Sequence, residues 1–331
     1  MKVLVTGGAG FIGSNFVDLL LDERPGWDIV NLDALTYAGH MKNLASAVAR
    51  PRHRFVHGDI CDGALVRDLM DGVDIVFNLA AESHVDRSIV SDQPFVRTNV
   101  TGTATLLAAA LDAEVGRFVQ VSTDEVYGEL PWADPESEAH EAAPRFTERT
   151  PLAPRSPYSA TKAAGDHLGL AYHVTHGLDV VVTRSSNNYG PRQFPEKLIP
   201  LMVRNALAGE PLPVYGDGLH VRDWIHVRDH GLGLLAAAER GAAGEVYNFG
   251  GGAERTNLSV VREILGLLDR PESLVEPVAD RPGHDRRYGI DFAKASDELG
   301  WTPGTAFDEG LAETVDWYRD NPDWIAAVSA S

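Results

Sequence analysis

A glycine-rich segment behind an apolar stretch constrains the fold of this chain more than any other feature. Residues 2–6 are predicted to form a buried strand, because apolar and β-branched residues dominate them. The glycines that follow fit Gly-x-Gly-x-x-Gly at Gly8, Gly10 and Gly13, and also a looser pattern that begins at Gly7. Either pattern lets the backbone approach a pyrophosphate on the N-terminus of the next helix. A glycine turn made only for packing is the alternative reading.

A carboxylate stands where a dinucleotide-binding fold needs one. The stretch 28–32 predicts a second strand, and this strand ends at Asp33, twenty positions after Gly13. A carboxylate at this place accepts hydrogen bonds from both ribose hydroxyls of an adenosine and repels a 2′-phosphate. Together the glycines and Asp33 favour NAD over NADP as the cofactor.

The next two strand ends carry softer signals. A strand over 54–57 leads to Asp59, which either accepts a hydrogen bond from an adenine amino group or caps the helix that follows. Both interpretations fit the sequence. A strand over 74–80 ends in Ala80 and Ala81, which are small enough for a cofactor to pass close to the backbone.

The alternation of strands and helices predicts the fold class. Apolar residues recur at helical spacing over 94–113, and a fifth strand covers 117–122. A sixth strand over 179–184 follows a further helix. This order predicts an α/β fold with a doubly wound parallel Rossmann sheet that helices cover on both faces.

The composition changes beyond residue 190. Short segments rich in Pro and Gly follow, among them a helix near 195–208 and a strand near 223–227. We therefore expect a NAD-binding Rossmann domain over 1–190 and a smaller mixed α/β substrate domain over 191–331. The smaller domain would lie at the carboxyl edge of the sheet, with the chain crossing between the two.

Two adjacent acids follow the fifth strand. Asp and Glu are poor strand formers, so the strand is expected to stop where Asp124 and Glu125 begin, directly after Thr123. In open parallel sheets this edge faces the ligand. An arbitrary Asp-Glu pair is more often an exposed acidic turn. If the strand geometry continued, the two side chains would point in different directions.

A Tyr-x-x-x-Lys pair lies on the next predicted helix, which covers 156–176 and stops at Gly177. Tyr158 and Lys162 are four residues apart and share a face. An ammonium one turn away would favour the phenolate and make Tyr158 a base at neutral pH. The same lysine could hold the nicotinamide ribose. A bare Tyr-x-x-x-Lys usually means only an amphipathic helix, but behind a dinucleotide-binding pattern the catalytic interpretation is favoured.

The stretch 129–157 is acidic and contains six prolines. It is too polar and too rich in proline for regular structure, and we expect a surface excursion that could overlie the site.

Composition limits the classes of partner. The formal net charge of −19 disfavours nonspecific binding to nucleic acid. No apolar run approaches the roughly 20 residues that span a bilayer, and no secretory signal is recognisable, so a cytoplasmic protein is expected. The lone Cys61 can form no internal disulfide. The histidines are scattered and form no recognisable metal motif, so no metal is predicted.

These motifs resemble the extended short-chain dehydrogenase/reductases and, among these, closely resemble the dTDP-glucose 4,6-dehydratases. The likeness covers nearly the whole chain, although the excursion is its least similar part. The motifs that carry it are 6–13, Asp33, 81–88, 122–128, 158–162, 187–191, 195–200 and 280–288.

The resemblance implies a reaction that begins and ends with hydride transfer. Tyr158 would remove the proton of the C4 hydroxyl while hydride passes to NAD, and Thr123 would hydrogen-bond the C4 oxygen. Glu125 would then take the C5 proton while Asp124 protonates the departing C6 hydroxyl. Return of hydride to C6 and of a proton to C5 gives a 4-keto-6-deoxy sugar. The spacing alone would allow the acid and base roles to be reversed.

The resemblance also implies three groups of site residues. The catalytic group is Thr123, Asp124, Glu125, Tyr158 and Lys162. The NAD-binding group is Gly7, Gly10, Phe11, Ile12, Gly13, Asp33, Thr36, Asp59, Ile60, Ala80, Ala81, Ser83, Thr98, Tyr158, Lys162 and Asn188. The substrate-binding group is Ser83, Thr123, Asn187, Lys197, Leu198, Pro213, Tyr215, Arg222, Asn257, Arg281 and His284. Arg222 also makes independent sense, because a guanidinium can hold a diphosphate with two hydrogen bonds.

Alternatives remain at this point. The substrate could be another nucleotide sugar, such as UDP- or CDP-glucose, and the reaction could be a 4-epimerisation. A protein of a different class, which senses NAD without catalysis, would be expected to lose the tyrosine, the lysine or the acids, and this chain has them all. The resemblance further implies a homodimer in which helices 94–113 and 156–176 of two subunits form a bundle.

Overall fold

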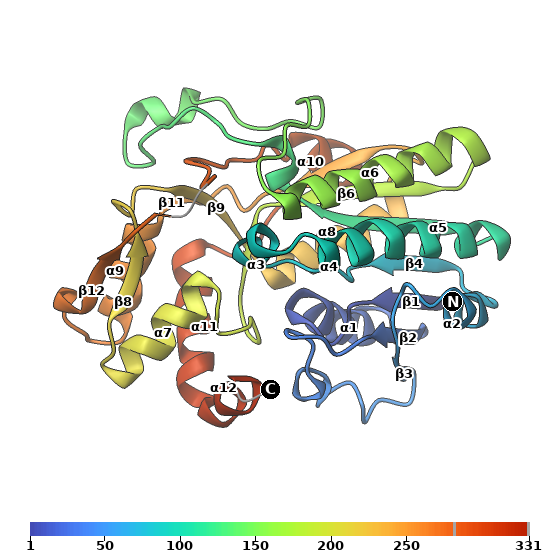
Figure 1. Ribbon diagram of the computed structural model, residues 1–331, viewed down its shortest axis with the longest axis horizontal. Helices are drawn as coiled ribbons and strands as arrows, with labels where there is room; N and C mark the ends of the chain where they lie inside the picture. The colour runs from blue at the N-terminus through green and yellow to red at the C-terminus, as the bar shows by residue number, and fades with distance from the viewer. Residues whose placement is uncertain (281–282, 330–331) are drawn as a thin grey trace.

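The computed structural model describes residues 1–280 and 283–329. Seven strands form the central sheet in the order β10-β6-β5-β4-β1-β2-β3, and all neighbouring strands run parallel (Figure 1). The sheet therefore confirms the predicted doubly wound parallel fold. Its strands are β1 (Lys2–Thr6), β2 (Asp28–Asp33), β3 (His53–His57), β4 (Ile75–Asn78), β5 (Arg117–Thr123), β6 (Val180–Ser185) and β10 (Val246–Phe249).

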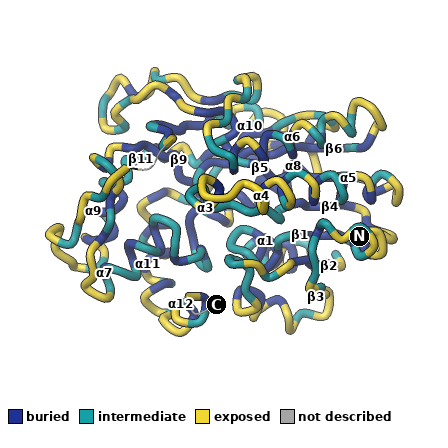
Figure 2. The backbone as a smooth tube through the Cα atoms, viewed as in Figure 1, coloured by how far each residue is buried: buried dark blue, intermediate teal, exposed yellow. Residues whose placement is uncertain are grey.

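Helices cover both faces of this sheet. Two of them, α1 (Phe11–Glu23) and α8 (Val227–Arg240), pack together over one face. The other face carries α2 (Gly63–Met70), α5 (Thr103–Asp112) and α6 (Pro157–His176). Apart from the edge strand β3, which has no fully buried residue, the strands between these layers are buried along most of their length (Figure 2). Burying a large apolar side chain contributes about 1.5–3 kcal/mol, so the two layers supply much of the stability of the sheet.

A second lobe has its own core and mixed strands. In its three-stranded sheet β9 (Val221–His226) pairs antiparallel with β11 (Glu254–Thr256) and parallel with β7 (Asn187–Tyr189). A second pair joins β8 (Leu212–Tyr215) to β12 (Val275–Val278). The surrounding helices are α7 (Leu198–Ala208), α9 (Asn257–Leu267), α11 (Phe307–Asp320) and α12 (Pro322–Ser329).

The chain passes between the lobes more than once. After β9 of the second lobe, α8 packs against the central sheet and β10 adds its edge strand. The helix α10 (Ala293–Leu299) then packs on α8 and β10. Strands close in sequence, such as β6 and β7, therefore belong to different sheets.

Several predicted elements differ in their bounds. The helix predicted over 94–113 is divided into α4 (Gln93–Phe95), a π-helical segment η2 (Val96–Gly102) and α5, after a short α3 (Val85–Val90). In the π-helical segment Asn99 bonds both backbone groups of Glu82, at 2.9 and 3.0 Å, a tertiary contact that helical periodicity does not reveal. Likewise α7 begins at Leu198 rather than near 195, because Lys197 is still extended, and β4 ends before residue 80.

The excursion over 129–157 holds only one short helical turn, η4 (Glu138–Ala142). Its polar anchor is the buried carboxylate of Glu254 in β11. This group accepts hydrogen bonds from Arg287 at 2.7 and 3.0 Å and from Arg145 of the excursion at 3.1 Å. Arg287 also donates to the Pro144 carbonyl at 2.9 Å. The excursion is thus fastened to the second lobe. Among the described residues, the 3₁₀ turns are η1 (Met41–Leu44), η3 (Asp124–Tyr127), η4 and η5 (Glu272–Leu274).

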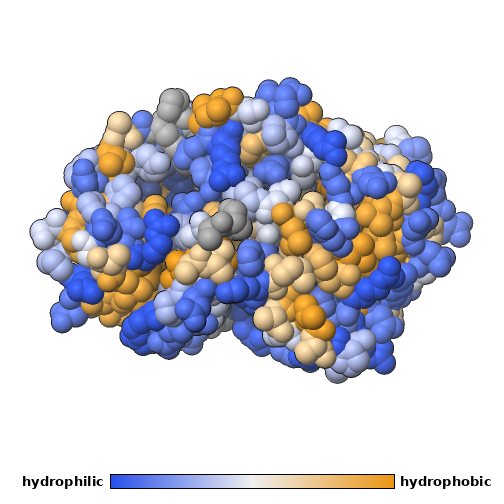
Figure 3. Space-filling view, turned by 60° about the horizontal axis from the view of Figure 1, so that its bottom comes forward, coloured by the Kyte–Doolittle hydropathy of each residue, from blue (hydrophilic) through white to orange (hydrophobic). Residues whose placement is uncertain are grey.

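Within the described part of the chain, no helix combines the length and the apolar character that crossing a membrane requires. On the face drawn in Figure 3, hydrophobic residues form several separate patches, with hydrophilic residues between them.

Candidate functional site

A cavity of about 320 Å³ lies at the carboxyl ends of the central strands. It contains every predicted catalytic and NAD-binding residue, and four of the predicted substrate residues: Ser83, Thr123, Asn187 and Lys197. None of its lining residues comes from 129–157. The structure therefore brings the glycine loop, the acid pair and the Tyr158–Lys162 pair into one cavity, although these segments are far apart in the sequence.

The glycine loop forms a cradle that side chains would fill. Gly7 has φ +73°, and a Cβ there would lie 2.7 Å from the backbone of Ala80. A Cβ at Gly13 would lie 2.2 Å from the Gly7 carbonyl oxygen. Gly10 is the N-cap of α1, so the free amides of this helix point to the cavity end of the loop. This close backbone packing fits a dinucleotide pyrophosphate.

Asp33 is held at the end of β2. Its two carboxylate oxygens accept hydrogen bonds from the amides of Ala9 and Leu35, at 2.8 and 2.7 Å. Burial raises the pKa of this carboxyl, and the two amide donors oppose that rise. Each oxygen keeps a further lone pair, so the group fits the predicted role toward the ribose hydroxyls.

The capping alternative for Asp59 is wrong. The N-cap of α2 is Asp62, whose carboxylate accepts from the amides of Ala64 and Leu65. Asp59 instead accepts from the Cys61 amide at 2.8 Å and pairs with Arg97 at 2.5 Å, while it lines the cavity. Sequence could not decide this, because both acids precede the same helix.

The acid pair lies in a turn. β5 ends at Thr123 as predicted, and η3 begins at Asp124. The Thr123 hydroxyl accepts from the Glu125 amide at 3.3 Å and so caps the turn. The expectation of diverging strand geometry is therefore wrong, but successive residues of a 3₁₀ turn also point about 120° apart.

Asp124 is buried in the turn, and burial raises the pKa of its carboxyl. The residue is 2% exposed, and its Oδ2 has no hydrogen-bond partner among the described residues. Burial raises the pKa of Asp124 well above its usual value, and the neighbouring charges of Glu125 and Asp223 raise it further. A raised pKa favours the protonated form of the carboxyl, which is the form that a general acid needs.

Tyr158 and Lys162 lie on α6, which begins with a capping box between Ser156 and Ser159. Burial has the largest effect on the pKa of each. Burial, followed by the charge of Glu125, raises the pKa of Tyr158 well above 10.0, whereas Lys162 donates to the Val121 carbonyl at 2.6 Å. Burial also lowers the pKa of Lys162 to about 8. Helical spacing shows a shared face, but it does not show what the lysine contacts.

A buried polar chain continues from Lys162. Asp166, one turn further along α6, accepts from Arg184 Nε at 2.9 Å, and its charge opposes the fall in the pKa of Lys162. Arg184 also donates to the Tyr127 hydroxyl at 2.9 Å, and Tyr127 donates to Asn248 at 2.8 Å. This chain links the helix of the lysine to the turn of the acids.

Sequence reasoning missed part of the cavity wall. Glu196 pairs with His84 at 3.2 Å and with Arg87 at 3.5 Å, and burial raises its pKa. The signal was available, because Glu196 lies in the quoted motif 195–200. The other missed residues that bear polar or aromatic side chains are Tyr37, Glu82, Ser122, Ser185, Ser186, Gln193 and Phe194.

The other predicted substrate residues that the structure describes lie outside the cavity. Tyr215 and His284 are in edge-to-face contact at 6.0 Å, and His284 stacks on His220 at 3.7 Å. The Asn257 amide donates to the His220 carbonyl, so these four residues form one group. His220 was not predicted. Of the others, Leu198 opens α7, Pro213 lies in β8, and Arg281 is outside the described residues.

Arg222 is buried, and its guanidinium donates hydrogen bonds to backbone carbonyls of the protein. It donates to the Val221 and Asp285 carbonyls at 2.7 and 2.9 Å, and its guanidinium lies 4.3 Å from the centre of the Tyr288 ring. A substrate diphosphate would accept hydrogen bonds from the N–H groups of the guanidinium that these two bonds do not use.

His220, Asp280 and His284 are near enough to be considered as metal ligands. The two imidazole rings, however, are stacked with their planes only 14° apart. A metal ion lies close to the plane of each ring that binds it, and one ion cannot lie in two parallel planes. The carboxylate of Asp280 instead pairs with both rings, at 3.2 and 2.6 Å.

Comparisons with known proteins agree with this site. The model of the GDP-mannose 4,6 dehydratase family matches residues 4–314. A dTDP-glucose 4,6-dehydratase of Actinoplanes is 53% identical over 329 residues, which cover 98% of this chain and 99% of the relative.

Two solved structures are similar over nearly their whole length. The crystal structure of DesIV, a dTDP-glucose 4,6-dehydratase of Streptomyces venezuelae with NAD and TYD bound, has a TM-score of 0.94 and 51% identity, over 99% of this chain and 100% of that one. The dTDP-glucose 4,6-dehydratase of Bacillus anthracis in complex with NAD has a TM-score of 0.91 and 48% identity, over 99% of each chain.

Proposed function

The chain belongs to the GDP-mannose 4,6 dehydratase family, and from that premise we propose that it is an NAD-dependent hydro-lyase that converts dTDP-glucose to dTDP-4-keto-6-deoxyglucose. The observation that carries the proposal is the buried Asp124 next to Glu125, in the same cavity as Tyr158. Loss of water across C5 and C6 requires an acid and a base in addition to the group that deprotonates the C4 hydroxyl.

The residues take the predicted roles. Tyr158 accepts the proton of the C4 hydroxyl, and Thr123 positions the C4 oxygen. NAD, when bound, supplies the hydride acceptor for C4 and the hydride donor for C6. Because the C4 ketone acidifies C5, Glu125 can remove the C5 proton while Asp124 protonates the leaving C6 hydroxyl. A proton returns to C5 when C6 takes up hydride.

The residues present fit NAD. The glycine cradle admits a pyrophosphate, and Asp33 faces the same cavity as Tyr158 and Lys162. Lys162 would hold the nicotinamide ribose, and Asp59 would lie toward the adenine. The substrate diphosphate and nucleobase would lie toward Lys197, Arg222 and the group around His284.

The acid pair disfavours a 4-epimerase, because inversion at C4 needs no proton transfer at C5 or C6. UDP- or CDP-glucose as the substrate remains the alternative within the same reaction. The test is to incubate the protein with the dTDP-, UDP- and CDP-glucoses and detect the loss of one water by mass spectrometry. Loss of water from none of them would refute the dehydratase proposal.

Variants separate the steps. Tyr158→Phe is expected to reduce turnover by about 10²–10⁴-fold, because it removes the base of the first step. Glu125→Gln should still form NADH on mixing with substrate but release little product. If Tyr158→Phe were as active as the parent, the proposed mechanism would be wrong.

We also propose a homodimer, a cytoplasmic location and a division into a cofactor domain (1–190) and a substrate domain (191–331), with the chain crossing between them, since α8, β10 and α10 pack with the central sheet. Exposed apolar side chains near the expected bundle, Ile89, Val90 and Val96, support the dimer. Sedimentation equilibrium would test it. The single Cys61 suits a reducing compartment.

A further inference from the structure

Arg192 stands at the junction of the two lobes in a backbone conformation that side chains rarely adopt. Its φ is +70°, in the left-handed region. Its neighbours are fixed to the second lobe, because Tyr318 of α11 donates to the Gln193 carbonyl at 2.8 Å. Contacts elsewhere must hold this conformation in place.

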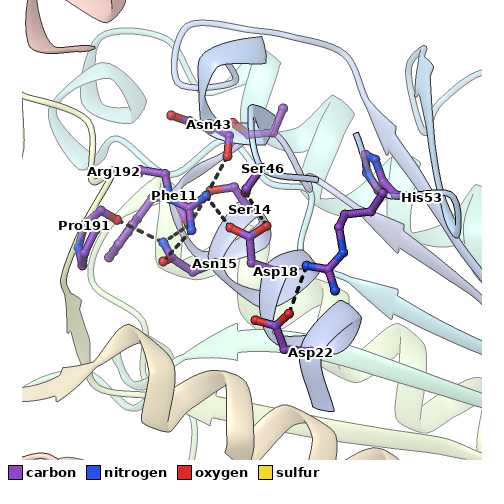
Figure 4. Close-up of polar contacts among 12 residues, drawn as sticks. Phe11, Ser14, Asn15, Asp18, Asp22, Asn43, Ser46, His53, Pro191 and Arg192 are labelled. Atoms are coloured by element: carbon purple, nitrogen blue, oxygen red, sulfur yellow. Dashed lines mark hydrogen bonds and ion pairs between the residues drawn. The ribbon is translucent and has the colours of Figure 1, made fainter. Parts of the chain in front are cut away.

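The Arg192 side chain reaches across to the first lobe (Figure 4). Its Nη1 donates to Asp18 Oδ2 and to the Asn43 carbonyl, both at 2.7 Å, and its Nη2 donates to Asn15 Oδ1 at 2.8 Å. Asn15 in turn donates to the Pro191 carbonyl at 3.0 Å, which closes a second link between the same segments. The side chains of Arg192 and Asp18 are only 16% and 25% exposed. One planar guanidinium thus joins α1 and the 41–44 turn to the start of the second lobe.

These contacts lie directly behind the predicted cofactor cradle. Asn43 donates to the carbonyl of Ala9, in the glycine loop, at 2.8 Å. Its Oδ1 accepts from Trp324 of α12 at 2.8 Å, so the second lobe holds Asn43 from both sides. The cavity wall includes Phe11 from α1 and Gln193 from the junction. Parting these two walls would break the bonds of Arg192.

We propose that Arg192 is a positioning residue that latches the second lobe onto the glycine-loop helix and thereby retains bound NAD. The latch rests on the proposed function in one respect, which is that NAD occupies the cradle. Arg192 does not line the cavity, so it acts through α1 and the 41–44 turn and not on the reacting atoms.

The test compares Arg192→Ala and Arg192→Gly with a matched control. Glycine adopts a positive φ without strain, so Arg192→Gly removes the side chain without adding a backbone cost. Arg50→Ala is the control. Arg50 pairs at 3.0 Å with Asp22, which lies on α1 one turn after Asp18. This ion pair is exposed and does not involve the second lobe. Figure 4 shows Asp22 beside the latch.

The readout is the rate of NAD release, measured by displacement with a fluorescent NAD analogue, together with kcat at saturating NAD. Both Arg192 variants are expected to release NAD about tenfold faster or more, because several hydrogen bonds to a charged group are lost. The Arg50 variant should release NAD at the parent rate, and kcat at saturating NAD should stay within about twofold in every variant, as expected for a residue that acts only on cofactor retention. Arg192→Lys should release NAD at a rate between those of the parent and Arg192→Ala, because an ammonium reaches fewer of the acceptors.

Release from Arg192→Gly at the parent rate would overturn the latch while leaving the proposed function intact. Equal loss of kcat and of NAD retention in both Arg192 variants would also overturn it, because that pattern indicates a damaged fold. A parent protein that binds no NAD would instead refute the proposed function, and the latch with it.

Discussion

Asp223 should destabilise the protein at neutral pH, and Asp223→Asn should therefore increase its stability. Asp223 lies in β9, is 1% exposed and accepts from the Ala253 amide at 2.8 Å. Burial raises the pKa of this carboxyl from 3.8 to about 6, against the effect of the Ala253 amide. The folded protein therefore binds this proton more tightly than the unfolded chain does, and the associated stability is lost as the pH rises through 6.

The magnitude follows from the two pKa values. They differ by about two units, and each unit corresponds to about 1.4 kcal/mol, so the ionised carboxyl costs about 3 kcal/mol at pH 8. At pH 5 the cost should fall to about half, because the folded protein then keeps the proton. Asparagine keeps an oxygen for the Ala253 amide and carries no charge. Asp223→Asn is thus expected to be more stable by up to about 3 kcal/mol at pH 8, with a smaller gain at pH 5.

The assay is urea unfolding of parent and variant at both pH values, without NAD. Asp22→Asn serves as the control, since Asp22 is exposed and its ion pair is worth at most about 1 kcal/mol. A variant that is less stable than the parent at pH 8 would refute the reasoning, because it would mean that the ionised carboxylate is better solvated by the protein than its burial implies.

Three further predictions concern the cradle, the lysine and the excursion. Gly13→Ala should weaken NAD binding about tenfold or more in a fluorescence titration, because its Cβ would lie 2.2 Å from the Gly7 carbonyl oxygen and the loop would have to open; unchanged affinity would contradict the cradle. Asp166→Asn should lower the pKa of Lys162 below about 8, because the charge of Asp166 raises it. The decline of kcat at alkaline pH should therefore begin at lower pH, with a several-fold loss at pH 8. An unchanged dependence of kcat on pH would show that Asp166 does not keep Lys162 charged. Glu254→Gln should destabilise the fold by about 3–5 kcal/mol and speed proteolysis within 129–157, because Arg287 would be left buried without its carboxylate; equal cleavage rates would show that Glu254 does not hold the excursion.

Much of the fold could be predicted because its signals are local. The strand over 2–6, the glycine loop and the helix that Ser156 and Gly177 delimit were confirmed within a residue or so, since each depends on residues that touch their sequence neighbours. The elements that were missed or misplaced depend on distant partners. The π-helical segment is tied to Glu82 through Asn99, and β10 returns to the central sheet after the chain has already entered the second lobe.

The candidate site divides in the same way. The sequence determined which side chains are catalytic candidates and which strand or helix each of them follows or begins. This was possible because strand ends and helix starts can be predicted from local sequence patterns. Only the tertiary structure decided their chemical state. Burial is a property of the assembled core, and it raises the pKa of both Asp124 and Tyr158, while Lys162 donates to the backbone carbonyl of Val121. The contacts of Arg192 with Asn15 and Asp18 span more than 170 residues, a separation at which no local pattern carries information.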